Sequence, residues 1–222
     1  DDAAGPSLDS AANPANGTWA GTPTPSTDVP APIAGFSTQS LGLNATGENV
    51  NLGNVAKLAL PRYTIAGWIK TSDTTARHKI VTSRNASSTS RNWWLSVWGS
   101  TTDHTHADGA LAFRTSSNGV GSAVDLGSGT VRVNDGAWHH VAVVLDGTTA
   151  ARLYVDGALL STKASPGVVD RPDVAAYIGD DPSGGTDRWV DGGLGGHYGQ
   201  ILSRLDYLSA GNPHAYCFSV VL

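Results

Sequence analysis

The stretch DGAWHHVAVVLDGTTAARLYVDG, residues 135–157, decides the fold. In residues 151–156 apolar and polar side chains alternate, which is the period of a strand with one buried face. Residues 138–145 are apolar on both faces, as expected of a covered central strand. The Asp-Gly pairs at 146–147 and 156–157 tolerate the positive φ that tight antiparallel connections need. These features predict a β-hairpin.

The same stretch resembles the signature of laminin-G-like and pentraxin-like jelly rolls, within the wider concanavalin A-like superfamily. Further segments are similar to strands of that family and lie at residues 40–53, 63–70, 177–179 and 198–208. The resemblance therefore extends over most of the chain. It implies an all-β fold, a two-sheet antiparallel jelly-roll sandwich of laminin-G-like type.

Length and composition favour one domain over residues 1–222. Because the chain contains no methionine, even at position 1, we expect a module of a longer or processed polypeptide. The net charge is −5 and the acidic residues are scattered, so nucleic acid is not an expected partner. No apolar run of about 18 residues occurs, so no membrane span is predicted. The single cysteine, Cys217, excludes an intrachain disulfide.

The acidic residues argue against catalysis. Retaining glycoside hydrolysis uses two carboxyl groups about 5 Å apart. Laminarinase-like members of the superfamily place them in a Glu-x-Asp-x-x-Glu string, which this chain cannot form because Glu48 is its only glutamate. We therefore predict that the domain is not an enzyme, and a polysaccharide-degrading activity is the third hypothesis for its function.

The segment WWLSVW, residues 93–98, is the predicted ligand-binding region. By strand alternation Trp94 and Trp98 share one face, and Leu95 resembles an inward-facing position of the family. Two tryptophans on an exposed face would form a platform for stacking on a sugar ring. Polar candidates beside the platform are Asn92, Arg91 and Arg84. The alternative is that a loop such as residues 23–32 covers this face, so that both rings are secondary core.

The one candidate cofactor is a structural calcium ion, and a plain Asp/Gly turn is the other interpretation of the same residues. Calcium takes oxygen ligands, which loops rich in Asp and Gly supply. The densest acidic loop offers Asp180, Asp181, Asp187 and Asp191. In several members of the family that this chain resembles, an acidic residue of the closing strand also binds a structural calcium ion. Residues 194–197 read LGGH here and lack that acid.

The histidines occur in two informative pairs. His104 and His106 alternate with aspartates in residues 103–108, where they could ligate a transition metal or belong to a solvated loop. His139 and His140 follow one another on the predicted central strand, so one faces inward and one outward. We expect a hydrogen-bonded structural role for this second pair.

Together these features predict a noncatalytic recognition or adhesion module of an extracellular, cell-surface or particle-surface protein. Its expected partner is a glycan or an extracellular protein. The alternative is a structural subunit of a surface or virion-like assembly, in which the jelly roll packs against copies of itself. In that case the apolar C-terminal run, residues 215–222, would be a strand donated to a neighbour.

Overall fold

Regular structure in the described part of this protein consists of β-strands. The computed structural model describes residues 16–31, 39–43, 47–54, 62–74, 77–84, 91–100, 105–117, 120–146, 149–164, 174–179, 200–201, 204–206 and 217–219. Within these ranges no α-helix occurs, and all strand pairs except one are antiparallel. None of the described residues belongs to a helix that is long and apolar enough to span a membrane.

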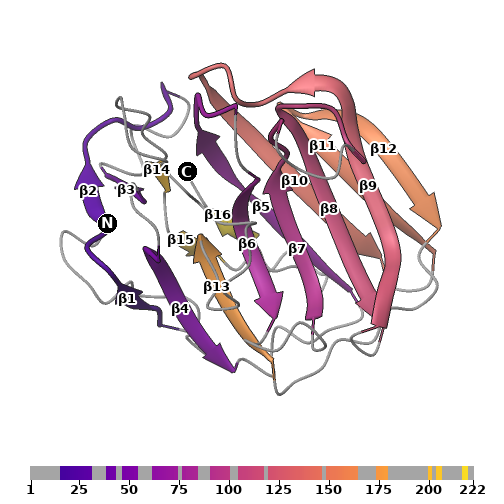
Figure 1. The fold of residues 1–222 in the computed structure, drawn as a ribbon, viewed down its shortest axis with the longest axis horizontal. Helices are drawn as coiled ribbons and strands as arrows, with labels where there is room; N and C mark the ends of the chain where they lie inside the picture. The colour runs from indigo at the N-terminus through magenta and orange to yellow at the C-terminus, as the bar shows by residue number, and fades with distance from the viewer. Residues whose placement is uncertain are drawn as a thin grey trace.

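The strands form two layers (Figure 1). The first is a seven-stranded sheet. Its strands, in spatial order, are β1 (Thr18–Ala20), β4 (Asn49–Asn54), β13 (Ala175–Gly179), β6 (His78–Arg84), β7 (Arg91–Val97), β8 (Ala110–Ser117) and β9 (Val120–Arg132). Because β4 and β13 are distant in sequence but adjacent in space, the early and late parts of the chain meet in this layer.

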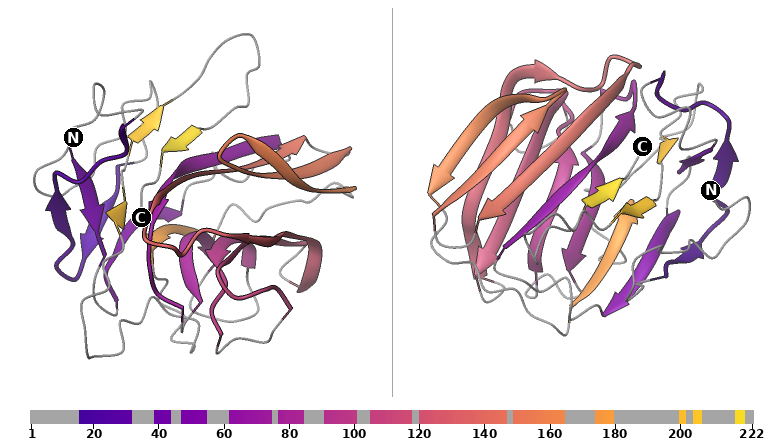
Figure 2. Two further views of the ribbon diagram at one scale, coloured as in Figure 1. Left: turned by 90° about the horizontal axis from the view of Figure 1, so that it is seen from above. Right: turned by 180° about the vertical axis from the view of Figure 1, so that it is seen from behind.

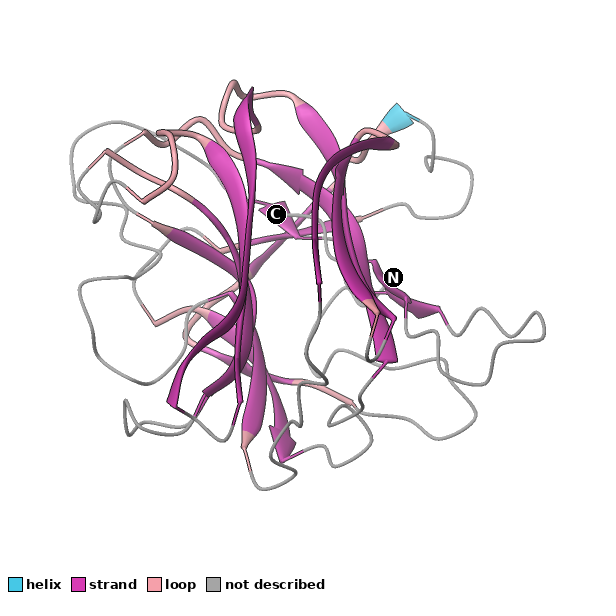
Figure 3. Ribbon diagram, turned by 90° about the vertical axis from the view of Figure 1, so that its right-hand side faces the viewer, coloured by secondary structure: helices cyan, strands magenta, loops and turns pink. Residues whose placement is uncertain are grey.

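The second layer is a nine-stranded sheet. Its main path is β12 (Ala158–Ala164), β11 (Ala150–Val155), β10 (Trp138–Asp146), β5 (Arg62–Lys70), β14 (Gln200–Ile201), β3 (Ser40–Gly42) and β2 (Thr24–Ser26). β15 (Arg204–Asp206) pairs with β16 (Cys217–Ser219), which touches β5 in parallel. The left view of Figure 2 and the view of Figure 3 show the two sheets as separate layers. The predicted two-sheet jelly-roll sandwich is confirmed.

The inward faces of both sheets supply one hydrophobic core. On β10 the side chains of Val141, Val143 and Leu145 are buried, whereas Ala142 and Val144 between them are half-buried. The predicted hairpin is confirmed, since β10 pairs with β11. The expectation that β10 is covered on both faces is wrong, because its outer side chains are partly open to solvent.

His139 joins the two ends of this hairpin. Its Nε2 lies 3.0 Å from Asp135 Oδ1, and its Nδ1 lies 2.8 Å from Asp156 Oδ2. The N–H of His140 donates to Asp156 Oδ1 over 2.8 Å, and the N–H of Asp156 donates to the carbonyl of His140 over 2.7 Å. Asp156 has a φ of 50°, a left-handed conformation that aspartate tolerates better than most residues. The expected structural role of the histidine pair is thus confirmed for His139.

The two carboxylates favour the charged imidazole. Burial lowers the pKa of His139, but the hydrogen bonds and charges of Asp156 and Asp135 outweigh it and raise this pKa above 6.5. The pKa of Asp135 is lowered, first by the N–H of Ala137 and then, against burial, by His139. When His139 is protonated, the contact is therefore a charge-assisted bridge between two turns.

We predict that His139→Gln lowers the stability most in mildly acidic solution. Because folding raises the pKa of His139, the stabilisation is fully present below the unfolded value of about 6.5 and is lost as the pH rises through the raised value. The expected loss is about 1–2 kcal/mol at the acidic end, reduced by the exposure of the two carboxylates. Thermal unfolding of both proteins across this pH range measures the effect.

The matched control is His140→Gln, since the His140 ring contacts Trp68, whereas it is the His139 ring that bonds Asp135. Its effect on the melting temperature should not follow the same pH dependence. A loss for His139→Gln that is equal at all pH values would contradict the charged bridge.

Candidate functional site

The predicted tryptophans lie on the outer face of the seven-stranded sheet. Their neighbours Trp93 and Leu95 belong to the core, so Trp94 and Trp98 point the other way, as alternation predicts. Yet Trp94 is 7% exposed and Trp98 is 0% exposed. The expected exposed platform is therefore wrong, and burial favours the alternative of secondary core.

The loop that was expected to cover this face lies elsewhere. Within residues 23–31, Asp28 bonds Lys70 and Trp138, which belong to the other sheet. Of the predicted polar candidates, Asn92 is buried and donates from Nδ2 to Ser83 Oγ over 3.0 Å. Asn92 is thus committed within its own sheet. Arg91 is paired with Arg84 in the β6–β7 register, and the positions of the two side chains are outside the described structure.

Polar and charged side chains pack around Trp98. Together with this ring they form the group that we call the charged cluster: Arg77, Trp98, His106, Arg114 and Asp125. The guanidinium carbons of Arg77 and Arg114 lie 3.8 and 4.8 Å from the centre of the indole ring. The ring of His106 meets the same indole edge-on at 4.9 Å. Such contacts combine cation–π attraction with burial of the aliphatic stems.

Asp125 holds the outer part of the charged cluster. Its Oδ2 accepts from Arg114 Nε over 3.0 Å, and its Oδ1 lies 2.7 Å from His106 Nε2. Burial raises the pKa of Asp125, but His106 and Arg114 outweigh it and hold this pKa below the ordinary value. His106 lies over Gly127, where any Cβ would overlap its ring. The alternative of a solvated loop is thus wrong for His106, whose side chain is only 14% exposed.

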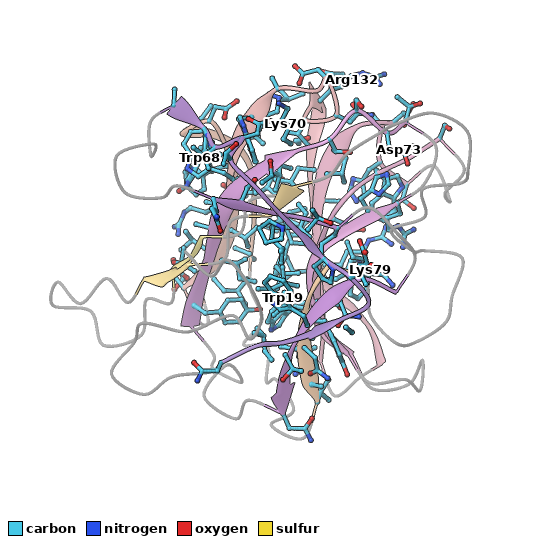
Figure 4. All side chains as sticks on the ribbon, turned by 90° about the vertical axis from the view of Figure 1, so that its left-hand side faces the viewer. Trp19, Trp68, Lys70, Asp73, Lys79 and Arg132 are labelled. Carbon is cyan, nitrogen blue, oxygen red and sulfur yellow. The ribbon has the colours of Figure 1, made fainter. Side chains whose placement is uncertain are left out.

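The outer face of the nine-stranded sheet carries a second set of rings, which we call the aromatic face: Trp68, Trp138, His140 and Tyr154. All four side chains are half-buried, unlike the tryptophans of the other sheet. Trp68 is the register partner of His140, and their rings meet edge-on at 5.3 Å. Figure 4 shows Trp68 and Lys70 on this layer and Lys79 on the opposite one.

Asp28 fixes one end of the aromatic face. Its Oδ1 accepts from Trp138 Nε1 over 3.0 Å, and its Oδ2 accepts from Lys70 Nζ over 2.6 Å. The same ammonium lies 5.8 Å from the centre of the Trp138 ring. Burial raises the pKa of Asp28, but the bonds from Lys70 and Trp138 and the charge of Lys70 outweigh burial. The net effect holds this pKa below the ordinary value, so the carboxylate is ionised at neutral pH.

The sequence patterns did not predict this face, although its four residues lie within two of the segments that resemble the family, residues 63–70 and 135–157. Trp68 and Trp138 are far apart in sequence, and only the β5–β10 register places Trp138 opposite Lys70 and His140 opposite Trp68. The available signal was strand alternation within residues 138–145. It was not used because that strand was expected to be covered on both sides.

The four aspartates predicted to bind calcium, Asp180, Asp181, Asp187 and Asp191, lie outside the described residues. Among the residues that are described, no group of three or more His, Cys, Asp or Glu side chains could hold a metal ion. His106 bonds Asp125 instead.

We predict that Trp98→Ala strongly lowers the free energy of unfolding of the domain. Removing a fully buried indole leaves a cavity and strips two guanidinium groups of their aromatic partner, so the expected loss is about 3–5 kcal/mol. Chemical denaturation measures it, with Trp98→Phe as the milder control because that variant keeps a ring. A change below about 1 kcal/mol for Trp98→Ala would show that the ring is not part of the packed structure.

Comparison with known proteins identifies the family of this chain and several structures with a similar fold. A sequence search of curated proteins gave no match. The binding domain of botulinum neurotoxin serotype D has a similar fold, with TM-score 0.53, 14% identity, and coverage of 84% of this chain and 42% of that one. The binding domain of Paraclostridial Mosquitocidal Protein 1 gives TM-score 0.52 at 11% identity, covering 80% and 40%. This chain thus spans less than half of either toxin domain.

The module CBM40 of the Ruminococcus gnavus IT-sialidase is comparable in size, with TM-score 0.51, 18% identity, and coverage of 72% of this chain and 88% of that one. At such identities these likenesses show the fold alone. A laminin G family model described as the concanavalin A-like lectin/glucanases superfamily matches residues 44–195, more than half of the sequence. The chain therefore belongs to the laminin-G-like family of the concanavalin A-like lectin/glucanase superfamily.

Proposed function

We propose that this protein is a noncatalytic carbohydrate-recognition module and that a pyranose ring stacks on the aromatic face. The observation that carries the proposal is the pair of half-buried indoles, Trp68 and Trp138, beside the ionised Asp28 and the ammonium of Lys70. Sugar sites combine an aromatic surface for the apolar face of the ring with a few fixed polar groups for its hydroxyls. This face offers both.

The polar groups of the aromatic face are positioned before a ligand arrives. Asp28 bridges Lys70 and Trp138, which restricts the rotation of both side chains. His140 is held against Trp68, and burial lowers the pKa of His140 despite the charge of Asp156, so its ring is neutral above mildly acidic pH. A neutral imidazole can donate to or accept from a sugar hydroxyl. Restricted side chains reduce the entropy cost of binding.

A noncatalytic role is supported by where the carboxylates lie. Glu48 is 4% exposed, and its Oε1 accepts a hydrogen bond from Thr22. Asp28 and Asp125 each bridge cationic or aromatic side chains and have lowered pKa values, so neither is suited to act as a general acid. Asp28 contacts the nine-stranded sheet and Asp125 lies on β9 of the other sheet, so these two carboxyls do not form a matched pair for hydrolysis.

The comparisons support the proposal at the level of the fold. The similar structures are toxin binding domains and a sialidase module, which in one structure is bound to sialyllactose. By extension we propose a glycan partner for this chain and a location outside the cell or on a cell or particle surface. We also propose, as part of the same function, that the module takes part in adhesion.

The alternative, a structural subunit that packs against its own copies, has less support. Strand β12 is the outermost described strand of its sheet, and Leu159 is 52% exposed. However, the β11–β12 ladder contains a bulge, and Lys163 lies on the same strand. Bulges and lysines are the features that discourage edge-to-edge pairing.

We predict that Trp68→Ala weakens glycan binding roughly tenfold, because each well-stacked aromatic contact is worth about 1 kcal/mol or more. A glycan array identifies the ligand, and titration calorimetry then measures its affinity for wild type, Trp68→Ala and Trp68→Phe. The phenylalanine variant should retain part of the affinity.

The control is Val131→Ala, which alters an apolar side chain on the other sheet, where Val131 is 38% exposed. Its affinity should equal that of wild type. A blank array for the folded wild-type domain would refute carbohydrate recognition. Binding that is unchanged in Trp68→Ala would move the site away from the aromatic face.

Calcium remains a separate proposal, carried by the acidic loop from Asp180 to Asp191. If the ion is structural, chelation should lower the melting temperature, and added calcium should restore it because a ligand that binds only the folded state stabilises it. Asp187→Asn should remove the calcium response without affecting the charged cluster. An identical melting curve with and without chelator would eliminate the site.

A further inference from the structure

We propose that the aromatic face holds two sugar subsites and that its ligand is a neutral, linear oligosaccharide. The first subsite consists of Trp68 and Trp138, and the second consists of Tyr154 and Arg152, which lie together on β11. This inference rests on the proposed function, because it concerns the same face, and it adds the length and the charge class of the glycan. The strand register, the ion pair at each subsite and the surplus of carboxylates around the face support it.

Tyr154 lies apart from the two indoles on the same face of the sheet. In the β10–β11 ladder Tyr154 is opposite Ala142. In the β5–β10 ladder Trp68 is opposite His140. Tyr154 is therefore two residues along and two strand spacings across from Trp68, a separation of about 12 Å between the Cα atoms. This distance exceeds the span of one pyranose ring, so a ligand that stacks on both side chains contains more than one sugar unit.

A half-buried stretch of β10 separates the two subsites. The line from Trp68 to Tyr154 crosses this strand beside His140 and Ala142, and both of these residues are half-buried. Ala142 contributes only a methyl group at this point. Across from Tyr154, on the neighbouring strand β12 (Figure 1), Leu159 is 52% exposed. The described side chains thus leave a sugar chain a route from one subsite to the other.

The second subsite has a cation held by a carboxylate, as the first has in Lys70. Asp146 Oδ2 accepts from Arg152 Nη1 over 2.9 Å, and Asp146 Oδ1 accepts from the N–H of Ala150 over 2.7 Å. The side chains of this pair are each 34% exposed. Arg152 and Tyr154 are two residues apart on one strand, so they share a face. Because a guanidinium has more N–H donors than this bond uses, it can also donate to hydroxyls of a sugar that stacks on Tyr154.

The charges around the face favour a neutral ligand. Lys70 and Arg152 are each paired with a carboxylate. Two more carboxylates, Asp135 and Asp156, flank the hairpin and share the imidazole of His139. Among the side chains described for this face, carboxylates therefore outnumber cations. Like charges repel, so an acidic sugar is disfavoured here, whereas a neutral chain needs only stacking contacts and hydrogen bonds.

The test compares glycans by length and by charge, with the whole chain as the binding protein. A glycan array presents cello-, laminari- and manno-oligosaccharides of one to six sugar units, and hyaluronan oligosaccharides as acidic chains. Calorimetry then measures the series that binds. In a neutral series the affinity should rise roughly tenfold from the shortest chain that binds to a plateau, because a second ring becomes stacked. Added salt should leave this affinity unchanged, because salt screens interactions between charges.

Three variants locate the two subsites, and thermal unfolding checks that each one is folded. Tyr154→Ala should lower the affinity for long chains roughly tenfold and leave the affinity for the shortest chain unchanged. Tyr154→Phe keeps a ring, so it should keep the dependence on length. Trp68→Ala should instead weaken the binding of chains of every length. Val131→Ala on the other sheet is the control and should bind all chains as wild type does.

The outcomes separate this inference from the proposed function. Affinity that depends on Trp68 but not on chain length or on Tyr154 would keep the proposed function and overturn the second subsite. Tighter binding of the acidic chains, with an affinity that falls as salt is added, would overturn the neutral class of ligand. Failure of the folded wild-type protein to bind any of these chains would overturn both.

Discussion

One imidazole joins the two turns that flank the central hairpin of the sandwich. Asp135 precedes β10 and Asp156 follows β11, and His139 bonds both carboxylates. Because Asp156 also closes two backbone bonds with His140, the strand ends on both sides of the hairpin are fixed together. The register of β10 then places its outer residues opposite those of β5. The aromatic face is a consequence of this register.

Sequence alone predicted the fold because its strongest signals are local. The Asp-Gly turns and the alternation of residues 151–156 set the hairpin without knowledge of any distant segment. Alternation also predicted which way Trp94 and Trp98 point. It could not predict whether they are exposed, because alternation assigns a side chain to a face but does not say what packs on that face. For Trp98 the burial comes from Arg77 and His106, which lie outside β7 and pack on the ring.

The candidate sites were harder to predict for the same reason. The aromatic face needs Asp28, Lys70 and Trp138 together, and 110 positions separate the first from the last. No periodic pattern connects such residues. The charged cluster likewise needs the ring of His106 to lie over Gly127, which depends on the absence of a side chain at one position of β9. Both arrangements come from tertiary packing.

The two outer faces use the same device, in which a carboxylate holds a cation and an aromatic group together. Asp28 does this for Lys70 and Trp138, and Asp125 does it for Arg114 and His106. Both carboxylates have lowered pKa values, so their contribution is present above the ordinary value of 3.8 and is lost only as the pH falls through the lowered one. The His139 bridge loses strength on the alkaline side instead. Because Asp28 stays ionised above its lowered pKa, it keeps Lys70 and Trp138 in place through the neutral range, so the aromatic face is arranged before any ligand binds.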